Sequence, residues 1–549
     1  MAVTRLSGGR ARRAGLLSGC IGLSSLLALA GTAADGVSAE RPATTTVCGG
    51  LDADSMFTAE AATLGREHAC EHLQLRAHPA GRASGVHRVS AAAREAPASA
   101  IGRWSAARNP GTNTVGIAAV LLHTGRVLLV GAEENAGENT PAYVLNPVTG
   151  RGHAVTTPAP IFCSSLTPLS DGRILSVGGA RPFPNGINDV LLFDPRTEQW
   201  LPQPATSNAR YYPTSTRLPS GRVVITAGTQ QDGVTDNPDV EVYTPPAAGG
   251  NLGALRVVGP EHPTANYPHQ LVMRDGRMLQ IDRTRASVLN PATWNWNTLP
   301  APIRSTGEGS AHLMLPGGPA GSSRVMLIGG RIRGLAQATT QTFDYAHRAR
   351  GWKRGTPMPT PRAHMNVVQV PDGSAYAIGG NSEGAKEAPR RRTMHYDPAT
   401  RRWRNLAGQA PRRAYHSTAV LLPDGRIMSA GDEKAGGGRQ LIDFYSPPYL
   451  FHGTRPRITA ARNAVRNGQR FGIRTRGPEV SGAVLMAPGA TTHANEMNAR
   501  RVPLSVTRTS RGLRARVPSR AVAPPGYYML FVLRANGVPS KARWVHVTR

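Results

Sequence analysis

The sequence predicts an almost entirely β-stranded protein, built from seven repeated units that are followed by a β-sandwich. Gly 61 and Pro 45 are high counts for 549 residues, and no long stretch places apolar residues at helical spacing. Both features favour strands that are joined by many turns. A sequence unit that recurs along the middle of the chain is the third observation.

This unit occurs seven times between residues 117 and 431. Each copy has an apolar run, a Gly-containing turn such as Asp-Gly-Arg, and a second apolar run, which is typical of a β-hairpin. The copies span residues 117–132, 164–179, 213–228, 268–282, 311–330, 365–380 and 417–431. Most are followed by two further β-like stretches, so each unit supplies four strands. Four strands in about 50 residues are typical of a kelch-type β-propeller, here with seven blades over residues 105–447.

Beyond the repeats, residues 448–549 contain short alternating strands that predict an immunoglobulin-like β-sandwich. Residues 40–104 form an N-terminal extension that is partly helical in pattern and continues as an Ala- and Arg-rich linker. The fold class is therefore all-β, with a seven-bladed propeller before the sandwich.

Residues 1–39 predict an export signal, with basic residues up to Arg13, an apolar run over 14–30 and small residues at Ala34 and Ala39. The expected location is secreted, periplasmic or extracellular. Arg12 and Arg13 also fit a twin-arginine signal, so the export route stays open. After the signal no segment reaches the roughly 18 apolar residues of a membrane span, and we expect no transmembrane segment.

The four cysteines divide into distinct groups. Cys20 leaves with the signal, and Cys48 and Cys70 lie close enough in sequence to be a candidate disulfide. Cys163 is then an odd thiol in an exported protein, which calls for an explanation.

The chain carries 64 Lys+Arg against 34 Asp+Glu, a formal net charge of +30. Such a charge suits nucleic acid, an anionic cell-surface polymer or an acidic substrate. The arginines are spread along the chain without a basic block interleaved with aromatics, which argues against nucleic acid. An anionic polymer outside the cell remains as a partner.

Reactive side chains stand immediately before three of the repeat hairpins. They are Cys163, Tyr211, Tyr212, Tyr415 and His416. Each alone is most simply read as a packing residue. Their common position in three blades predicts that they meet near the propeller axis. Imidazole and phenolate groups together suit copper or iron better than calcium or magnesium.

Longer motifs carry a family resemblance. They are IFCSS (161–165), ARYYPT (209–214), AYHSTAVLLPDGR (414–426), FYSPPYLF (444–451), GATTHANEMNARRVPL (489–504) and PGYYMLFVLRANGVPS (525–540). With them, residues 160–549 resemble the galactose oxidase and glyoxal oxidase family of copper radical oxidases. That family has a seven-bladed kelch propeller followed by an immunoglobulin-like domain.

The resemblance implies a copper ion held by Tyr212, Tyr415, His416 and His493, and a thioether bond between Cys163 and the ring of Tyr212. It implies that a primary alcohol or aldehyde is oxidised while O2 is reduced to H2O2. The cross-linked Tyr212 forms the radical that takes a hydrogen atom from the substrate, and Tyr415 is the general base. Copper and the Cys163–Tyr212 cross-link are the implied cofactors, and no organic cofactor is expected.

The sequence departs from the family at the residue that covers the radical. Galactose oxidase has a tryptophan there, whereas this chain has Gln230. We expect Trp294 or Trp296 to supply the cover instead. Tyr211 stands where glyoxal oxidases often carry tryptophan, which places the chain nearer to that branch.

Two other kinds of protein remain as alternatives. A non-catalytic kelch propeller could bind cell-surface carbohydrate, but it gives no reason for the reactive set. A propeller hydrolase or lyase would need paired carboxylates or an arginine triad; arginine is in excess, but the strand starts show no convincing pair of acids. Simple aldehydes, primary alcohols and the terminal groups of a carbohydrate all stay open as substrates.

Overall fold

The protein is described by a computed structural model, in which all described residues lie within the unit Thr46–Arg549. The structure describes residues 96–112, 114–131, 139–181, 184–247, 250–305, 307–316, 323–381, 391–432 and 440–549. The predicted export signal, the partly helical extension up to residue 95 and the candidate disulfide Cys48–Cys70 lie outside these residues.

Strands dominate the described residues, and the all-β prediction is confirmed. Within the described ranges, the helical elements are one α-helical turn and two 3-10 helices: α4 (Ala98–Ile101), η2 (Tyr345–Arg350) and η3 (Pro448–Phe451). Among the described residues, no helix combines the length and the apolar character that crossing a bilayer requires.

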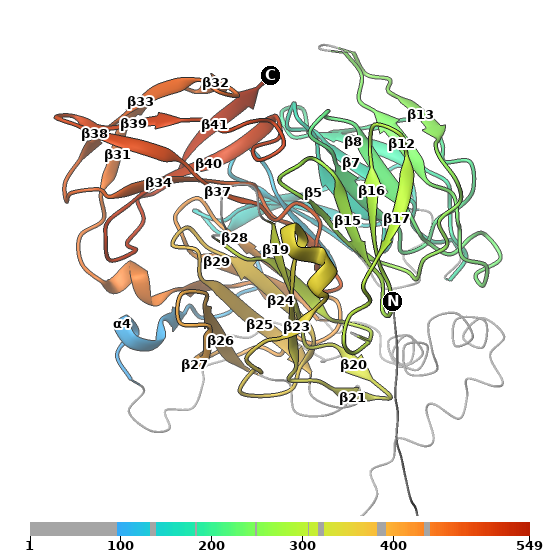
Figure 1. The fold of residues 1–549 in the computed structure, drawn as a ribbon, viewed down its shortest axis with the longest axis horizontal. Helices are drawn as coiled ribbons and strands as arrows, with labels where there is room; N and C mark the ends of the chain where they lie inside the picture. Colours follow the sequence, from blue (N-terminus) through green and yellow to red (C-terminus); the bar gives the residue numbers. More distant parts are fainter. Residues whose placement is uncertain are drawn as a thin grey trace, which may run out of the picture. The chain divides into compact units, whose positions relative to one another are not determined.

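The seven repeat copies form the first two strands of seven antiparallel sheets (Figure 1). The first four sheets, each given from its first strand, are β2 (Ala118–Leu121), β3 (Val127–Val130), β4 (Ala142–Asn146), β5 (Arg151–Val155); β6 (Ser165–Pro168), β7 (Ile174–Val177), β8 (Val190–Asp194), β9 (Gln199–Pro202); β10 (Thr214–Arg217), β11 (Val223–Thr226), β12 (Glu241–Thr244), β13 (Ala254–Val257); and β14 (His269–Val272), β15 (Met278–Ile281), β16 (Ala286–Asn290), β17 (Asn295–Leu299).

The remaining three sheets follow the same plan with two additions. They are β18 (Ala311–Met314), β19 (Arg324–Ile328), β22 (Thr340–Asp344), β23 (Lys353–Arg354); β24 (Ala363–Gln369), β25 (Ala375–Asn381), β26 (Arg392–Asp397), β27 (Arg402–Gly408); and β28 (Ser417–Leu421), β29 (Ile427–Gly431), β30 (Asp443–Ser446). A short hairpin, β20 (Arg331–Ile332) and β21 (Leu335–Ala336), interrupts the first of these. The last is completed by β1 (Arg103–Trp104), which precedes all the repeats and pairs with β30.

The first strand of each sheet lies next to the first strands of its neighbours. Contacts join β2 to β6, β6 to β10, β10 to β14, β18 to β24, β24 to β28, and β28 back to β2. The ring nitrogens of His269 on β14 and His312 on β18 are 3.0 Å apart, which links that pair of sheets too. Residues that immediately precede the first strands are therefore brought toward one another.

The hairpin turns have the chemistry that the repeats predict. In the first copy Gly125 has φ 83° and its N–H donates to the carbonyl of Leu122, and Gly425 in the last copy has φ 87° with the same bond to Leu422. A positive φ is costly for residues with a Cβ, so glycine at this point fixes where each hairpin turns.

The C-terminal region is a sandwich of two sheets. One sheet contains β31 (Arg457–Ala461), β33 (Arg470–Arg476), β39 (Gly512–Arg516) and β38 (Ser505–Thr509); the other contains β32 (Ala464–Arg466), β41 (Arg543–Thr548), β40 (Gly526–Leu533), β34 (Gly482–Met486) and β37 (Arg501–Pro503). Phe471 and Leu513 of the first sheet pack on Leu485 and Leu530 of the second. The opposite face of β34 and β40 packs against residues of the repeat sheets, among them Val420.

One hairpin leaves the sandwich and joins the repeat sheets. It consists of β35 (Ala490–Thr492) and β36 (Asn495–Glu496), and β35 pairs antiparallel with β2, Thr492 opposite Ala118. The sheet that begins with β2 therefore has six strands. This pairing fixes the position of the residues at the tip of the hairpin, His493 and Ala494.

Candidate metal centre

The residue at the entrance to the first strand adopts the left-handed conformation in every one of the seven sheets. These entrance residues are Gly116 (φ 77°), Cys163 (56°), Tyr212 (64°), Tyr267 (48°), Gly309 (65°), His364 (56°) and His416 (62°). For a residue with a Cβ this conformation costs of order 1–3 kcal/mol and is concentrated at functional sites. Five side chains are thus held in a strained conformation at equivalent points of the fold.

His493 reaches the same place by a different route. It and Ala494 are the two central residues of the β35–β36 hairpin, with φ 50° and 62°, as a type I′ turn requires. The turn puts the imidazole at the tip of the hairpin.

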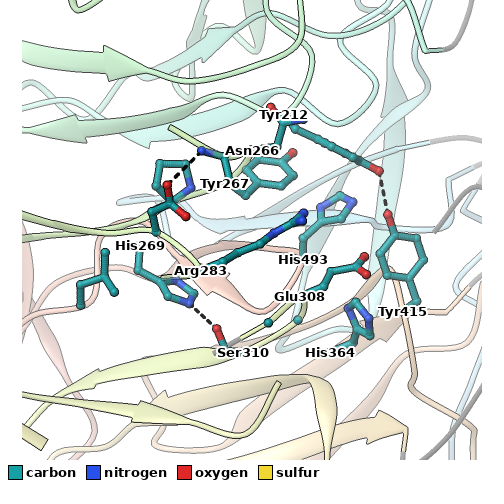
Figure 2. Close-up of a pocket in the computed structure, with 16 residues that line it drawn as sticks. Tyr212, Asn266, Tyr267, His269, Arg283, Glu308, Ser310, His364, Tyr415 and His493 are labelled. Carbon is teal, nitrogen blue, oxygen red and sulfur yellow. Dashed lines mark hydrogen bonds between the residues drawn. The ribbon is translucent and has the colours of Figure 1, made fainter. Parts of the chain in front are cut away.

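The structure brings together all five side chains that the sequence singles out for copper and for the cross-link. The Cys163 sulfur lies 3.6 Å from His493 Nε2 and 3.9 Å from His416 Nε2. The hydroxyls of Tyr212 and Tyr415 are 2.7 Å apart (Figure 2), and the Tyr415 ring stacks on that of His416 with 3.8 Å between centroids. Cys163, Tyr212, Tyr415 and His416 are buried, whereas His493 is only partly buried.

The hydrogen bonds of Thr492 determine which nitrogen of His493 faces this cluster. The Thr492 hydroxyl donates to the carbonyl of Ile117 at 3.0 Å, so at 2.6 Å it accepts from Nδ1–H of His493. The proton then resides on Nδ1, and Nε2 presents a lone pair toward Cys163. A bond of this kind fixes the tautomer and the ring orientation of a metal-binding histidine.

Tyr267 contacts three members of the cluster. Its hydroxyl donates to the carbonyl of Cys163 at 2.6 Å, and its ring lies 4.7 Å from the rings of both Tyr212 and His493. Burial raises the pKa of the Tyr267 phenol well above its usual value, so the hydroxyl stays protonated. Tyr267 therefore holds the backbone of Cys163 and covers part of the Tyr212 ring.

Tyr211 covers Tyr212 as well, with ring centroids 4.0 Å apart and planes 21° from parallel. The expectation that Trp294 or Trp296 covers Tyr212 is wrong. The Trp294 ring lies against Arg222, at 4.9 Å, and the Trp296 ring stacks on His262 at 3.8 Å. Trp296 belongs to the last strand of its sheet and Trp294 directly precedes that strand, so both lie far from the entrance residues.

Two buried ion pairs support the strand entrances. Arg413 lies two residues before Tyr415 and is 3.1 Å from Asp443, and Arg210, two residues before Tyr212, is 2.7 Å from Glu241. All four side chains have no exposed surface. Burial raises the pKa of Asp443 to about 6, although Arg413 acts in the opposite direction. Removing one member of such a pair leaves a buried charge uncompensated.

A cavity of about 70 Å3 opens onto the cluster. Tyr212, Tyr415 and His493 line it, together with Arg283 and Glu308 (Figure 2). A water molecule needs roughly 10–15 Å3 of such volume, so the cavity holds a molecule of a few heavy atoms.

Sequence reasoning missed Tyr267 and His364, which stand at the same entrance as Cys163 and Tyr212. His364 is buried, and its ring lies edge-on to Tyr415 with centroids 4.9 Å apart. Both residues directly precede or begin a repeat copy, at 268–282 and 365–380. Applying the repeat position to all seven copies, rather than to three, would have found them.

Comparisons with known proteins agree with this geometry. A family model described as Glyoxal oxidase N-terminus matches residues 139–436, and one described as Galactose oxidase-like, Early set domain matches residues 455–547. The chain is 27% identical over 502 residues to a galactose oxidase of Gibberella zeae, covering 83% of this chain and 72% of that protein. It is 29% identical over 441 residues to the aldehyde oxidase GLOX of Vitis pseudoreticulata, covering 70% and 82%.

Among solved structures, a fungal alcohol oxidase of the AA5 family in complex with copper has the same fold. The TM-score is 0.72 at 22% sequence identity, over 82% of this chain and 100% of that one.

Proposed function

Because the chain belongs to the glyoxal oxidase family of copper radical oxidases, we propose that it oxidises a small primary alcohol or aldehyde and reduces O2 to H2O2. The observation that carries this proposal is the cluster of two phenol oxygens, two imidazole Nε2 atoms and one thiol beside a small cavity. A protein that only binds carbohydrate has no use for such a cluster.

The side chains fit a copper ion by their chemistry. Imidazole nitrogen and phenolate oxygen are ligands that copper accepts well. Cys163 Sγ, His416 Nε2 and His493 Nε2 all lie within 4.8 Å of one another. Tyr212, Tyr415, His416 and His493 would hold the metal, and Cys163 would join Tyr212 by a thioether bond.

A bound copper ion would supply an acceptor for one of the two electrons that leave the substrate; the other would reach Tyr212 with the hydrogen atom, and O2 would recover both electrons as H2O2. Tyr415 Oη, 2.7 Å from Tyr212 Oη, is placed to hold the proton of the substrate hydroxyl. Tyr212 takes the hydrogen atom from the substrate carbon. The oxidation is then complete: the proton is on Tyr415, the hydrogen atom is on Tyr212, and the remaining electron goes to the metal. Tyr211 and Tyr267 exclude water from the Tyr212 ring.

The cavity supports a substrate of a few heavy atoms, or the end group of a larger molecule. Its volume of about 70 Å3 suits such a group, and Arg283 and Glu308 supply polar contacts at its wall. The proposed catalytic unit is the repeat region, residues 105–447, with residues 448–549 supplying His493.

The proposal places this enzyme outside the cytoplasm, on the strength of the signal-like residues 1–39. An anionic cell-surface polymer is the proposed partner that the charge of +30 favours.

Copper loading followed by two measurements tests the proposal. Mass spectrometry of the denatured protein should find one peptide that joins positions 163 and 212 and has lost a pair of hydrogen atoms. Peroxide release should then appear with one or more members of a panel of small alcohols and aldehydes. A loaded protein without the cross-link would contradict the proposed site, and a cross-linked protein inactive on the whole panel would contradict the substrate class.

A further inference from the structure

The outer face of one sandwich sheet is covered with arginine. β33 reads RFGIRTR and β39 reads GLRAR, with the side chains of alternate residues exposed. The exposed arginines on this face, called the arginine face below, are Arg457, Arg470, Arg474, Arg476, Arg514 and Arg516. None of the residues in β31, β33, β38 or β39 is acidic.

The alternation of the strands separates this face from the core. Phe471 and Ile473 of β33 point inward and pack with Leu513 and Ala515 of β39 against the second sheet. That second sheet is itself covered on its other side by the repeat region. The arginine face is therefore the side of the sandwich that is left exposed, and Figure 1 shows β31, β33, β38 and β39 as one layer.

The arrangement of these arginines is unfavourable for the sandwich alone. Arg470 lies directly opposite Arg516, and Arg457 directly opposite Arg476. Like charges at directly opposed positions destabilise a sheet. Among the described residues, none of the six arginines forms an ion pair or a side-chain hydrogen bond, and the nearby Glu479 pairs with Arg508 instead.

We propose that the arginine face is a docking surface for an acidic polysaccharide, a linear polymer whose sugar units carry carboxylate groups. Guanidinium groups bind carboxylates through paired hydrogen bonds, and a row of them on a flat sheet can follow an extended chain. Ser505 and Thr507 lie on the same face, opposite Arg516 and Arg514, where their hydroxyls can bond to sugar hydroxyls.

The same face is a poor match for nucleic acid. Its strands present no exposed aromatic side chain on which a base could stack. It is also a sheet face without a helix or ribbon that could enter a groove. Docking there would hold the oxidase on a polymer while leaving the small cavity of the repeat region open.

Binding to polygalacturonate should be compared between the parent protein and two variants with the same change in charge. The face variant carries Arg470→Gln, Arg474→Gln, Arg514→Gln and Arg516→Gln. The control variant carries Arg108→Gln, Arg151→Gln, Arg354→Gln and Arg402→Gln, at exposed arginines of the repeat region. Neutral dextran and duplex DNA serve as comparison polymers.

The face variant should lose at least about tenfold in affinity at low salt. Binding with fewer arginine contacts releases fewer counterions from the polymer, which lowers the affinity. The slope of log affinity against log salt concentration should become shallower by about one for each substituted arginine that contacts the polymer. The control variant should bind like the parent. Peroxide release from a small soluble substrate and the thermal midpoint should not fall in either variant.

Equal losses in both variants would mean that overall charge, not this face, drives binding, and would overturn the proposal. So would DNA that binds the face more tightly than polygalacturonate, or a parent protein that does not retain polygalacturonate at all. These outcomes are distinct from a failure of the oxidase proposal, since binding is measured without turnover.

Discussion

The repeat region and the C-terminal hairpin deliver reactive side chains to the same place in opposite ways. The repeat region uses one position seven times, filled by residues as different as Gly116, Cys163 and His416. The hairpin delivers a single residue, His493, whose position depends on strand pairing between β35 and β2. A repeated scaffold thus offers many equivalent positions, while one insertion completes the set. Each half of this comparison, the repeat region and the hairpin, can be tested by substitution.

Cys163→Ser tests the repeat half and should have the largest effect. Serine retains the size of the side chain but cannot form the thioether bond to Tyr212. Peroxide release should fall by about a thousandfold or more, which corresponds to several kcal/mol of lost transition-state stabilisation. The joined 163–212 peptide should disappear from the mass spectrum.

Ser164→Ala is the matched control for this change. Ser164 is the next residue, is buried, and accepts a hydrogen bond from Ser176 at 3.0 Å. Activity close to the parent is expected. If Cys163→Ser retained activity while Ser164→Ala lost it, local folding rather than thiol chemistry would explain the site.

Tyr267 tests whether an entrance residue acts by its ring or by its hydroxyl. Tyr267→Phe retains the ring against Tyr212 but loses the bond to the Cys163 carbonyl, so cross-linking should slow while the radical, once formed, persists. Tyr267→Leu loses both, and the radical signal in electron paramagnetic resonance should decay about ten- to a hundredfold faster than in Tyr267→Phe as water reaches the ring.

Tyr143→Phe is the control for the lost hydroxyl, because Tyr143 also donates to a backbone carbonyl, that of Pro110 at 3.0 Å, away from the cluster. It should cross-link at the parent rate. Equal radical lifetimes in Tyr267→Phe and Tyr267→Leu would exclude a covering role for the ring.

Thr492→Val tests the hairpin half. Without the Thr492 hydroxyl, Nδ1 of His493 loses its acceptor, and the tautomer with the lone pair on Nε2 is no longer selected. Loss of such a supporting bond typically reduces metal affinity about 10–100-fold. A copper titration monitored by calorimetry measures the change in copper affinity.

Thr491→Val removes a hydroxyl from the adjacent residue of the same strand, one that bonds to Asn366 and not to His493. Its copper affinity should remain within about threefold of the parent, because the bond between His493 Nδ1 and Thr492 is kept. Equal losses in the two variants would show that hairpin stability, and not the tautomer of His493, sets the affinity.

The difference between the repeat region and the hairpin also explains which features the sequence could predict. The family, copper and the all-β fold are confirmed, because the turn glycines mark each repeat and the motifs span most of the chain. Cys163, Tyr212 and His416 could be picked out because the repeat defines a position, even though their metal-binding roles remain proposals. His493 has no repeat position, and only the resemblance could point to it.

Sequence reasoning failed where a residue's function depends on the position of its strand within the sheet, which sequence distance does not reveal. Trp294 and Trp296 are close in sequence to a repeat but lie at its last strand, away from the first strands. The pairing of β1 with β30 joins two ends of the repeat region through a strand of only two residues, too short for any apolar pattern.

Glu496→Gln gives the smallest expected effect and concerns how firmly the hairpin is held. Glu496 accepts hydrogen bonds from the N–H groups of Ala490 and Asn498, and burial raises its pKa from 4.5 to about 7. The folded protein therefore binds a proton here that the unfolded chain releases between pH 4.5 and 7, so stability falls as pH rises through that window.

Gln at position 496 retains an oxygen acceptor but cannot ionise. The variant should match the parent near pH 4.5 and exceed it above pH 7 by about 1–3 kcal/mol in urea unfolding of the copper-free protein. Glu479→Gln, at an exposed residue, should leave the pH profile of the parent unchanged. A constant difference between Glu496→Gln and the parent at all pH values would mean that the carboxylate acts through its hydrogen bonds alone.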